Sequence, residues 1–297
     1  MRNLLVAASP AIFVLLWSTG FIGSKLGAPY IEPFAFLSVR FAIVLPVLFA
    51  MTLAMRRTWP ATFSDYLHCL VSGALMHGVY LGGIFWAIDN GMPAGISALV
   101  LGLQPLLTAL IAGPVLHEKI DAKHWVGLAA GGAGLALVLG PKLGLAASGI
   151  SAVTIAACIV SVVAMSAGAV YQKRFVSKID LLPGTTLQYA GALLITIPMS
   201  TFESWEITWS GDLIFALAWL IFVLSIGAIL LLMYLISQGS AARVAALFYL
   251  VPVATAVESY FLFDETLSAV QIAGMGLVIA AQILIQRGAI TLRRRQA

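Results

Sequence analysis

Charged residues are scarce in this chain. Asp, Glu, Lys and Arg together make up 9% of its 297 residues, whereas hydrophobic residues make up 61%. A soluble domain carries about 25% charged residues, and no water-soluble core could hide this much apolar surface. The composition therefore excludes a soluble protein and makes the lipid bilayer the solvent of the folded chain.

Cysteines and the common catalytic motifs are rare or missing as well. Cys69 and Cys158 are the two cysteines, and they give neither a disulfide framework nor the spacing of a metal site. The sequence contains no G-x-x-x-x-G-K-[ST], no H-E-x-x-H and no G-x-S-x-G, so it offers no phosphate-binding loop, zinc-protease helix or nucleophile elbow. We therefore expect no enzyme, no metal and no cofactor.

Long apolar stretches dominate what is present. They fall at roughly 5–26, 33–54, 65–87, 93–116, 123–140, 150–172, 182–201, 212–236, 241–263 and 267–286. Each is close to the roughly 20 residues that a membrane-spanning helix requires. The pattern predicts an all-α, polytopic membrane protein with ten transmembrane helices and short loops.

The basic residues predict the orientation in the membrane, because Lys and Arg gather in short cytoplasmic loops. With the N-terminus inside, the inner segments hold Arg2, Arg56, Arg57, Lys119, Lys123, Lys173, Arg174, Lys178, Arg287, Arg293, Arg294 and Arg295. The outer segments hold Glu32, Asp89, Glu203, Glu206, Asp212, Asp264 and Glu265, with Lys142 as their main cation. We expect a multi-pass protein of the inner membrane with both termini in the cytoplasm.

The chain repeats itself at an offset of 147 residues. The matching pairs are Pro105 with Pro252, Glu118 with Glu265, and Gly127 with Gly274. Any two helices rich in Leu, Ala and Gly align loosely, but these proline and glutamate matches share one offset. We interpret residues 1–145 and 146–297 as two five-helix repeats, the second ending in a short basic tail. Five spans per half is an odd number, so the second repeat is inverted, as in many secondary transporters.

Several short motifs together resemble those of a known family. They are Leu16-Trp17-Ser18, Arg40-Phe41, and the helix ends Leu116-His117-Glu118 and Phe263-Asp264-Glu265, each followed by a helix containing Gly127 or Gly274. With these features the chain resembles the EamA family of the drug/metabolite transporter superfamily. Its length and aromatic content are similar to those of the family's aromatic amino acid exporters. The halves differ where Ile96 corresponds to Arg243 and where Gln188 lies near the equivalent of Arg40.

Polar and aromatic residues inside the spans are the candidates for substrate binding, because such groups are costly in lipid and often functional. The candidates are Trp17, His77, Tyr80, Gln104, Tyr171, Tyr189, Tyr234 and Tyr249. Aromatic faces with a few hydrogen-bonding groups suit an amphipathic organic solute. The alternative for the tyrosines is helix packing with a bonded hydroxyl, and for His77 it is a hydrogen bond between helices.

Two prolines and two glutamates have candidate mechanical roles. We expect Pro105 and Pro252 to lie in mid-helix and to kink their helices, either as static bends or as hinges. Glu118 and Glu265 are expected to brace helix junctions. The small residues Gly127, Gly131 and Gly134 would let the fifth helix pack closely on the tenth, or would serve a dimer.

These observations favour a secondary transporter that exports amino acids, bulky or aromatic neutral ones in particular, and related metabolites by alternating access. The alternatives are a multidrug or other metabolite carrier and, less favoured, an intramembrane enzyme. A sugar-phosphate carrier would need several basic residues at the midplane, where Arg40 and Arg243 are the only candidates. Glu258 is essentially the only intramembrane acid, which favours passive over strongly proton-coupled transport. The expected partners are a small molecule and the lipid bilayer, without nucleic acid, and the protein is a monomer or homodimer.

Overall fold

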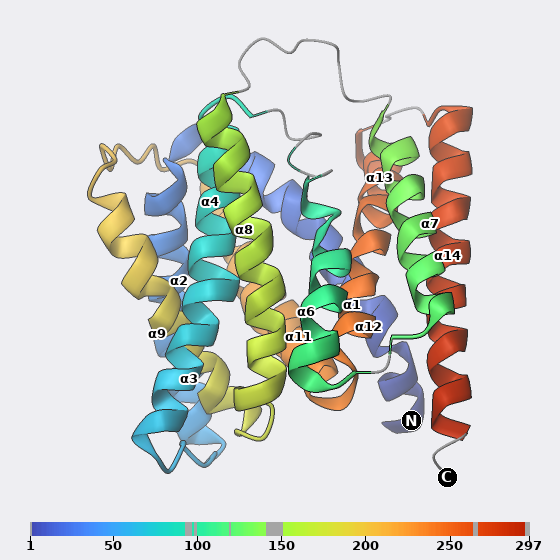
Figure 1. Cartoon of the computed structure of the whole chain (residues 1–297). Helices are drawn as coiled ribbons and strands as arrows, with labels where there is room; N and C mark the ends of the chain where they lie inside the picture. Colours follow the sequence, from blue (N-terminus) through green and yellow to red (C-terminus); the bar gives the residue numbers. More distant parts are fainter. Residues whose placement is uncertain are drawn as a thin grey trace.

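The chain folds into a bundle of helices (Figure 1), seen in a computed structural model that describes residues 2–92, 97, 100–118, 120–140, 151–263 and 267–294. The first half contains α1 (Arg2–Gly27), the 3-10 turn η1 (Ala28–Tyr30), α2 (Pro33–Ala54), α3 (Phe63–Gly73), the π-helical turn η2 (Ala74–Val79), α4 (Tyr80–Asp89), α6 (Gln104–Leu116) and α7 (Ala122–Leu139). The second half contains α8 (Ala152–Tyr171), η4 (Gln172–Val176, π-helical), α9 (Leu181–Ser200), α10 (Gly211–Trp219), η5 (Leu220–Ala228, π-helical), α11 (Ile229–Gln238), α12 (Ala241–Ala246), η6 (Leu247–Tyr249, 3-10), α13 (Leu250–Phe263) and α14 (Ala269–Arg294).

Six helical segments within the described ranges are long and apolar enough to cross a membrane. They are Pro33–Ala54, Phe63–Asp89, Ala122–Leu139, Ala152–Val176, Gly211–Gln238 and Ala241–Glu258, and shorter apolar helices cover Ala8–Gly20, Gln104–Leu116 and Ala269–Ile285. Large apolar side chains such as Leu15, Phe49 and Phe222 are about half exposed on the outside of the bundle. The structure therefore confirms an all-helical, multi-pass membrane fold, while the count of ten spans stays a prediction.

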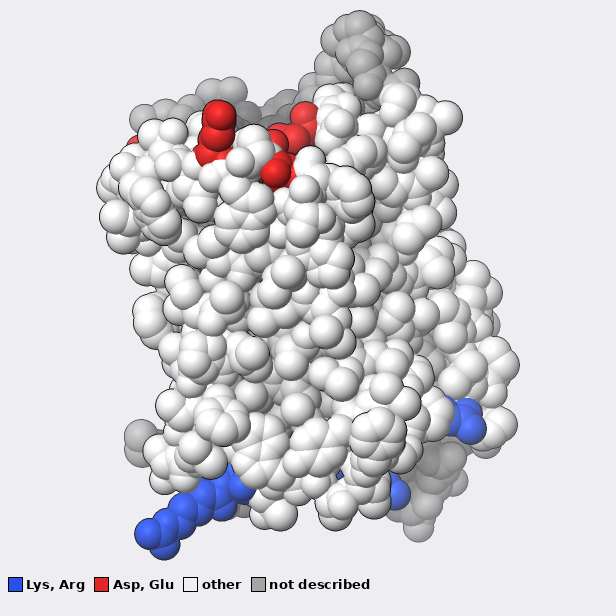
Figure 2. All heavy atoms as spheres, turned by 90° about the vertical axis from the view of Figure 1, so that its left-hand side faces the viewer, with Lys and Arg blue, Asp and Glu red and all other residues white. Residues whose placement is uncertain are grey.

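Charge is segregated between the two ends of the bundle. Figure 2 shows Lys and Arg at the lower end and Asp and Glu at the upper end of the face in view, and Figure 1 shows both chain termini at the lower end. We call the lower end, with Arg56, Arg57, Lys123, Arg174 and Lys178, the basic end. We call the upper end, with Glu32, Asp89, Glu203, Glu206 and Asp212, the acidic end. The apolar region between them matches a bilayer flanked by two aqueous faces.

Helix α7 packs along α14 through small residues. A Cβ atom on Gly134 would lie 2.9 Å from the carbonyl oxygen of Gly274, and a Cβ on Gly127 would touch the Ile285 side chain. Glycine at these positions lets the two backbones approach closely. Of the two uses proposed for this glycine stripe, the structure thus shows the packing of the fifth helix on the last.

Two carboxylates join the halves of the chain by capping helices in the opposite half. Glu118 accepts hydrogen bonds from the backbone nitrogens of Ala241 (2.7 Å) and Ala242 (3.3 Å) at the start of α12, near the basic end. Glu203 accepts from Phe34 (2.8 Å) and from Ala35 (2.6 Å) in the first turn of α2, at the acidic end. Both use the unpaired N–H groups and the positive end of a helix dipole.

The Glu203 carboxyl lies in the loop after α9, outside the membrane-spanning segments. Its partial burial raises the pKa of Glu203 above the ordinary value, and the neighbouring carboxylates of Glu32 and Asp89 act in the same direction. The hydrogen bonds from Phe34 and Ala35 lower this pKa but do not outweigh the burial. Glu265, the repeat partner of Glu118, lies outside the described residues.

The α7–α14 contact can be tested with one methyl group. The change G274A should lower the free energy of unfolding by about 1–3 kcal/mol, the usual cost of overpacking, because the new Cβ would lie 2.7 Å from the Gly134 carbonyl oxygen and 2.9 Å from the Val138 backbone nitrogen. Thermal melting of the purified protein in detergent measures the effect. The matched control is G276A, whose methyl group would meet nothing within 4 Å. Equal melting of the two variants would contradict the contact.

Candidate functional site

Helices α3 and α9 cross in direct backbone contact, and this crossing brings the two halves together. A Cβ on Gly73 would overlap the backbone of Gln188, and a Cβ on Gly191 would overlap the backbone of Leu70. A residue larger than glycine at either point would push the helices apart. Because η2 continues α3 directly, His77 is placed beside the middle of α9.

A chain of buried amides and hydroxyls starts at this crossing. The Ser72 hydroxyl donates to Oε1 of Gln172 (2.9 Å), and Nε2 of Gln188 donates to the same oxygen (2.8 Å). The three residues come from α3, η4 and α9 and are all buried. They link three helices inside an apolar bundle, where unsatisfied polar groups are costly.

His77 and Tyr189 form the aromatic centre of the site. Their rings stack with centroids 5.0 Å apart and an interplanar angle of 6°, and each residue is 1% exposed. The Tyr189 hydroxyl donates to the backbone carbonyl of Ser225 in η5 (3.0 Å). Nε2 of His77 and Oε1 of Gln188 make no hydrogen bond of good geometry, although the two side chains lie close enough to interact with each other. Some hydrogen-bonding capacity at this centre is therefore unused by the protein.

Arg40 of α2 lies against the same centre. It is 4% exposed, its Nε donates to the Ser225 hydroxyl (2.9 Å), and its guanidinium carbon lies 5.7 Å from the centroid of the Phe41 ring. It is also close enough to Tyr189 and His77 to interact with both electrostatically. We call Arg40, His77, Gln188, Tyr189 and Ser225 the central polar cluster.

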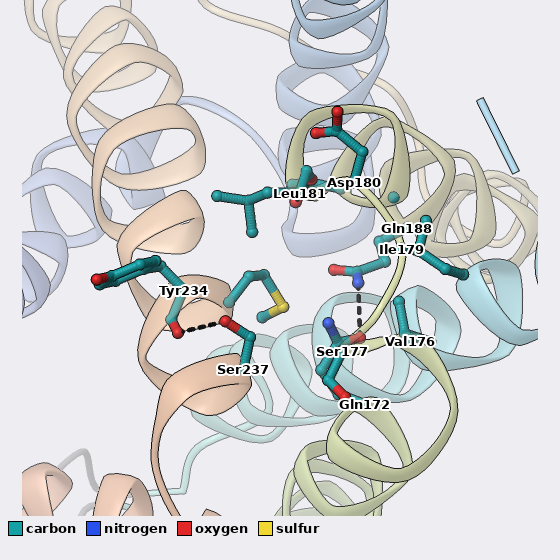
Figure 3. Close-up of a pocket in the computed structure, with 12 residues that line it drawn as sticks. Gln172, Val176, Ser177, Ile179, Asp180, Leu181, Gln188, Tyr234 and Ser237 are labelled. Carbon is teal, nitrogen blue, oxygen red and sulfur yellow. Dashed lines mark hydrogen bonds between the residues drawn. The ribbon is translucent and has the colours of Figure 1, made fainter. Parts of the chain in front are cut away.

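A small cavity adjoins the central polar cluster on the side of the basic end. Its volume is about 60 Å³, on a scale where one water molecule requires roughly 10–15 Å³. It is lined by Gln172, Val176, Ser177, Ile179, Asp180, Leu181, Gly184, Thr185, Gln188, Met233, Tyr234 and Ser237 (Figure 3). Gln188 belongs to both the cavity wall and the cluster, so the cavity leads to the cluster. In this conformation it holds water-sized molecules and is too small for an amino acid.

Four of the candidate binding residues lie at or beside these features. His77 and Tyr189 belong to the central polar cluster, and Tyr80, one turn after His77, is buried. Tyr234 lines the cavity, but Figure 3 shows its ring directed away from the other lining side chains, while its backbone carbonyl accepts a hydrogen bond from Ser237 (2.7 Å).

The other candidates lie elsewhere and have local partners. Trp17 packs with Phe13 and Phe248 at ring distances of 5.3 Å and 5.2 Å. Gln104 donates to Thr108 (3.2 Å), the Tyr171 hydroxyl bonds Nδ1 of His68 (2.6 Å), and the Tyr249 hydroxyl donates to the Leu128 carbonyl (3.2 Å). The structure does not bring these four residues together with the central polar cluster.

The sequence predicts that the two repeat prolines lie in mid-helix. In the structure each lies near the start of a helical element. Pro105 is in the first turn of α6, which begins at Gln104, and Pro252 is the third residue of α13, which follows the 3-10 turn η6. Proline is tolerated in a first turn because the N–H it removes has no helical partner there. Pro105 therefore marks a helix restart, whereas Pro252 follows a 3-10 turn inside the continuous helical stretch Ala241–Glu258.

The sequence did not single out Arg40 or Ser225 as parts of the site. Arg40 was read as a family motif and as one of two possible basic groups, and Ser225 carries no signal in an apolar stretch. The available signal was an arginine well inside a span, since intramembrane charges are rare and mostly functional. In the described part of the chain, no cluster of three or more His, Cys, Asp or Glu residues could hold a metal ion.

Comparison with known proteins gives matches over nearly the whole chain. The model of the EamA-like transporter family matches residues 5–140 and again residues 152–287. A protein of Bacillus subtilis described as "Uncharacterized transporter YvbV" is 27% identical and covers 93% of this chain and 89% of its own length. A "Probable amino-acid metabolite efflux pump" of Salmonella typhimurium is also 27% identical, over 91% of this chain and 90% of its own.

The fold also matches a solved structure. A crystal structure with 19% sequence identity superposes with a TM-score of 0.77, covering 97% of this chain and 98% of the other. At this identity the match shows a shared fold. An "Uncharacterized inner membrane transporter YedA" of Escherichia coli K12, 27% identical over 94% of this chain and 90% of its own, adds a relative from the inner membrane.

The hydrogen bond from Tyr189 to Ser225 can be tested with a matched pair of tyrosines. The change Y189F removes this interhelical bond and should lower the free energy of unfolding by about 0.5–1.5 kcal/mol. The control Y80F removes a hydroxyl that makes no hydrogen bond to the described residues, so it should change stability by less than about 0.5 kcal/mol. Unfolding in mixed detergents measures both. A larger loss for Y80F than for Y189F would contradict the site as described.

Proposed function

The chain belongs to the EamA-like transporter family, and from this premise we propose that it exports neutral amino acids, bulky or aromatic ones in particular, and related metabolites by alternating access. The observation that carries the proposal is the central polar cluster. It is buried inside an apolar bundle, where ionisable groups are expensive and usually functional. Arg40 and His77 come from the first half of the chain, and Gln188, Tyr189 and Ser225 from the second.

The location of the cluster fits a transporter with two repeats, in which substrate binds near the midplane between them. We propose ten transmembrane helices in two inverted five-helix repeats, divided near residue 145. The two matched ranges of the family model support this division. The segregation of charge supports an orientation with the basic end and both termini in the cytoplasm.

Aromatic walls support amino acids with bulky side chains as substrates. The His77 and Tyr189 rings, with Phe41 and Tyr80 nearby in the same core, offer apolar area worth about 25 cal/mol per Å². Such surfaces discriminate weakly, because one methylene is worth about 1–3 kcal/mol. We therefore expect broad specificity. The Salmonella typhimurium relative, described as a "Probable amino-acid metabolite efflux pump", is consistent with this class.

Transport requires a larger opening than the structure contains. A cavity of about 60 Å³ next to Gln188 is a narrow remnant of a path from the basic end. We propose that α9 and α11 separate to admit the substrate and that the halves then rock to open the acidic end. The segments around Pro105 and Pro252 are the proposed bending points, because proline cannot donate a backbone hydrogen bond to the preceding turn.

The proposal is tested by reconstituting the purified protein into liposomes loaded with an unlabelled amino acid and measuring the entry of the labelled one. L-phenylalanine, L-leucine and L-valine should exchange without a pH gradient, the first two fastest. Ethidium, a cationic drug, should not exchange. Exchange of ethidium without amino acids would identify a multidrug carrier, and uphill accumulation driven by a proton gradient would contradict passive transport.

Two buried glutamines provide a matched pair in the same assay. Gln188 lies in the cluster, whereas Gln104 bonds Thr108 outside it. Q188L should reduce exchange at least tenfold at equal expression, and Q104L should reduce it much less. The reverse order would place the substrate at Gln104.

A further inference from the structure

Arg40 carries a positive charge that pairs with no carboxylate among the described residues. The bond from its Nε to Ser225 is the one hydrogen bond that the guanidinium makes to the described residues. Among the described residues, the one ion pair joins Arg57 and Asp180 (3.7 Å) and does not involve Arg40. Burying an ionised group without a counter-charge is expensive, and the cost is recovered when an anion binds with good geometry.

The groups around Arg40 indicate what kind of partner would fit. Oε1 of Gln188 and Nε2 of His77 make no hydrogen bond of good geometry, although the two side chains lie close enough to interact with each other, and both belong to residues of the central polar cluster. Ser225 holds the Nε side of the guanidinium, and its two terminal nitrogens make no hydrogen bond to the described residues. A planar fork of N–H donors next to two unused polar atoms matches the two ends of an α-amino acid.

We propose that Arg40 binds the carboxylate of the transported substrate, while Oε1 of Gln188 and Nε2 of His77 accept hydrogen bonds from its ammonium group. This assignment rests on the proposed function and deepens it. A guanidinium binds a carboxylate through two parallel hydrogen bonds. The carboxylate neutralises the charge of Arg40 and the two neutral acceptors hold the ammonium, whereas a phosphate dianion leaves an excess negative charge and a cationic drug without a carboxylate is repelled.

The aromatic walls then contact the side chain of the substrate. Phe41 follows Arg40 directly, and its ring centroid lies 5.3 Å from that of Tyr189, which stacks on His77. The site therefore separates two tasks: the charged and polar atoms select the amino acid backbone, and the rings accept varied side chains. A narrow preference for the carboxylate should coexist with broad tolerance of the side chain.

The experiment compares L-phenylalanine with L-phenylalaninamide, which has the same ring and ammonium group but no carboxylate. Affinity is measured by calorimetry on the purified protein, and transport by exchange in liposomes. The unaltered protein should bind the acid at least tenfold more tightly than the amide. R40Q should lose that preference by weakening the acid and not the amide, and R40K, which keeps the charge but not the fork, should be intermediate. The matched control is R56Q, an exposed arginine just beyond the end of α2, which should behave as the unaltered protein.

Two results would overturn the proposal: equal binding of acid and amide by the unaltered protein, or a preference that survives in R40Q. If both Arg40 variants fail to fold, S225A provides the test, because it removes the hydrogen bond that holds the Nε side of the guanidinium. S225A should reduce the preference for L-phenylalanine over L-phenylalaninamide, and an unchanged preference would contradict the assignment. Benzoate and benzamide, compared by the shift in melting temperature, separate this inference from the proposed function. Stabilisation by benzoate alone, lost in R40Q, supports the anion site even if no amino acid is transported.

Discussion

The contact between the backbones of α3 and α9 at Gly73 and Gly191 determines where the two halves of the molecule meet. Without side chains at these positions the helices touch, and His77, one turn after Gly73, then stacks on Tyr189, two residues before Gly191. At this separation Ser72 and Gln188 both donate hydrogen bonds to Gln172. Close packing through small residues thus positions a polar site in a bundle whose remaining surfaces are apolar.

The protein treats its charges in two ways. At the ends of the bundle, Glu118 and Glu203 each cap a helix of the opposite half, so that carboxylates satisfy backbone donors and hold the halves together. In the interior, Arg40 is held by one hydroxyl and meets no carboxylate among the described residues. The carboxylates that stabilise the fold are thus hydrogen-bonded to backbone N–H groups. The guanidinium of Arg40, which we assign to substrate recognition, has no carboxylate partner among the described residues. Under the proposed function, this division lets a chain with so few charged residues both assemble and offer a site for a polar solute.

Much of the fold could be predicted from the sequence, and less of the site. Long apolar stretches and the distribution of Lys and Arg are properties of whole segments. The membrane spans and the orientation that they predict therefore do not depend on the role of any single residue. The helix restart at Pro105 and the 3-10 turn before Pro252 could not be predicted, because hydropathy does not reveal where a helix restarts or tightens. Helices such as α2 are apolar on nearly every face, so no periodicity indicates which side faces the interior. For that reason Trp17 and Tyr249 were grouped with His77 and Tyr189, although their partners lie elsewhere.

The central claim is that substrate binds where the two halves meet, at the central polar cluster. The most direct test is an experimental structure of the protein in lipid, determined with saturating L-phenylalanine. The account predicts density for the ligand between α2, η2, α9 and η5, with its carboxylate at Arg40 and its ring against His77 or Tyr189. Ligand density beside Trp17, Phe13 and Phe248, with the central polar cluster unchanged, would contradict it.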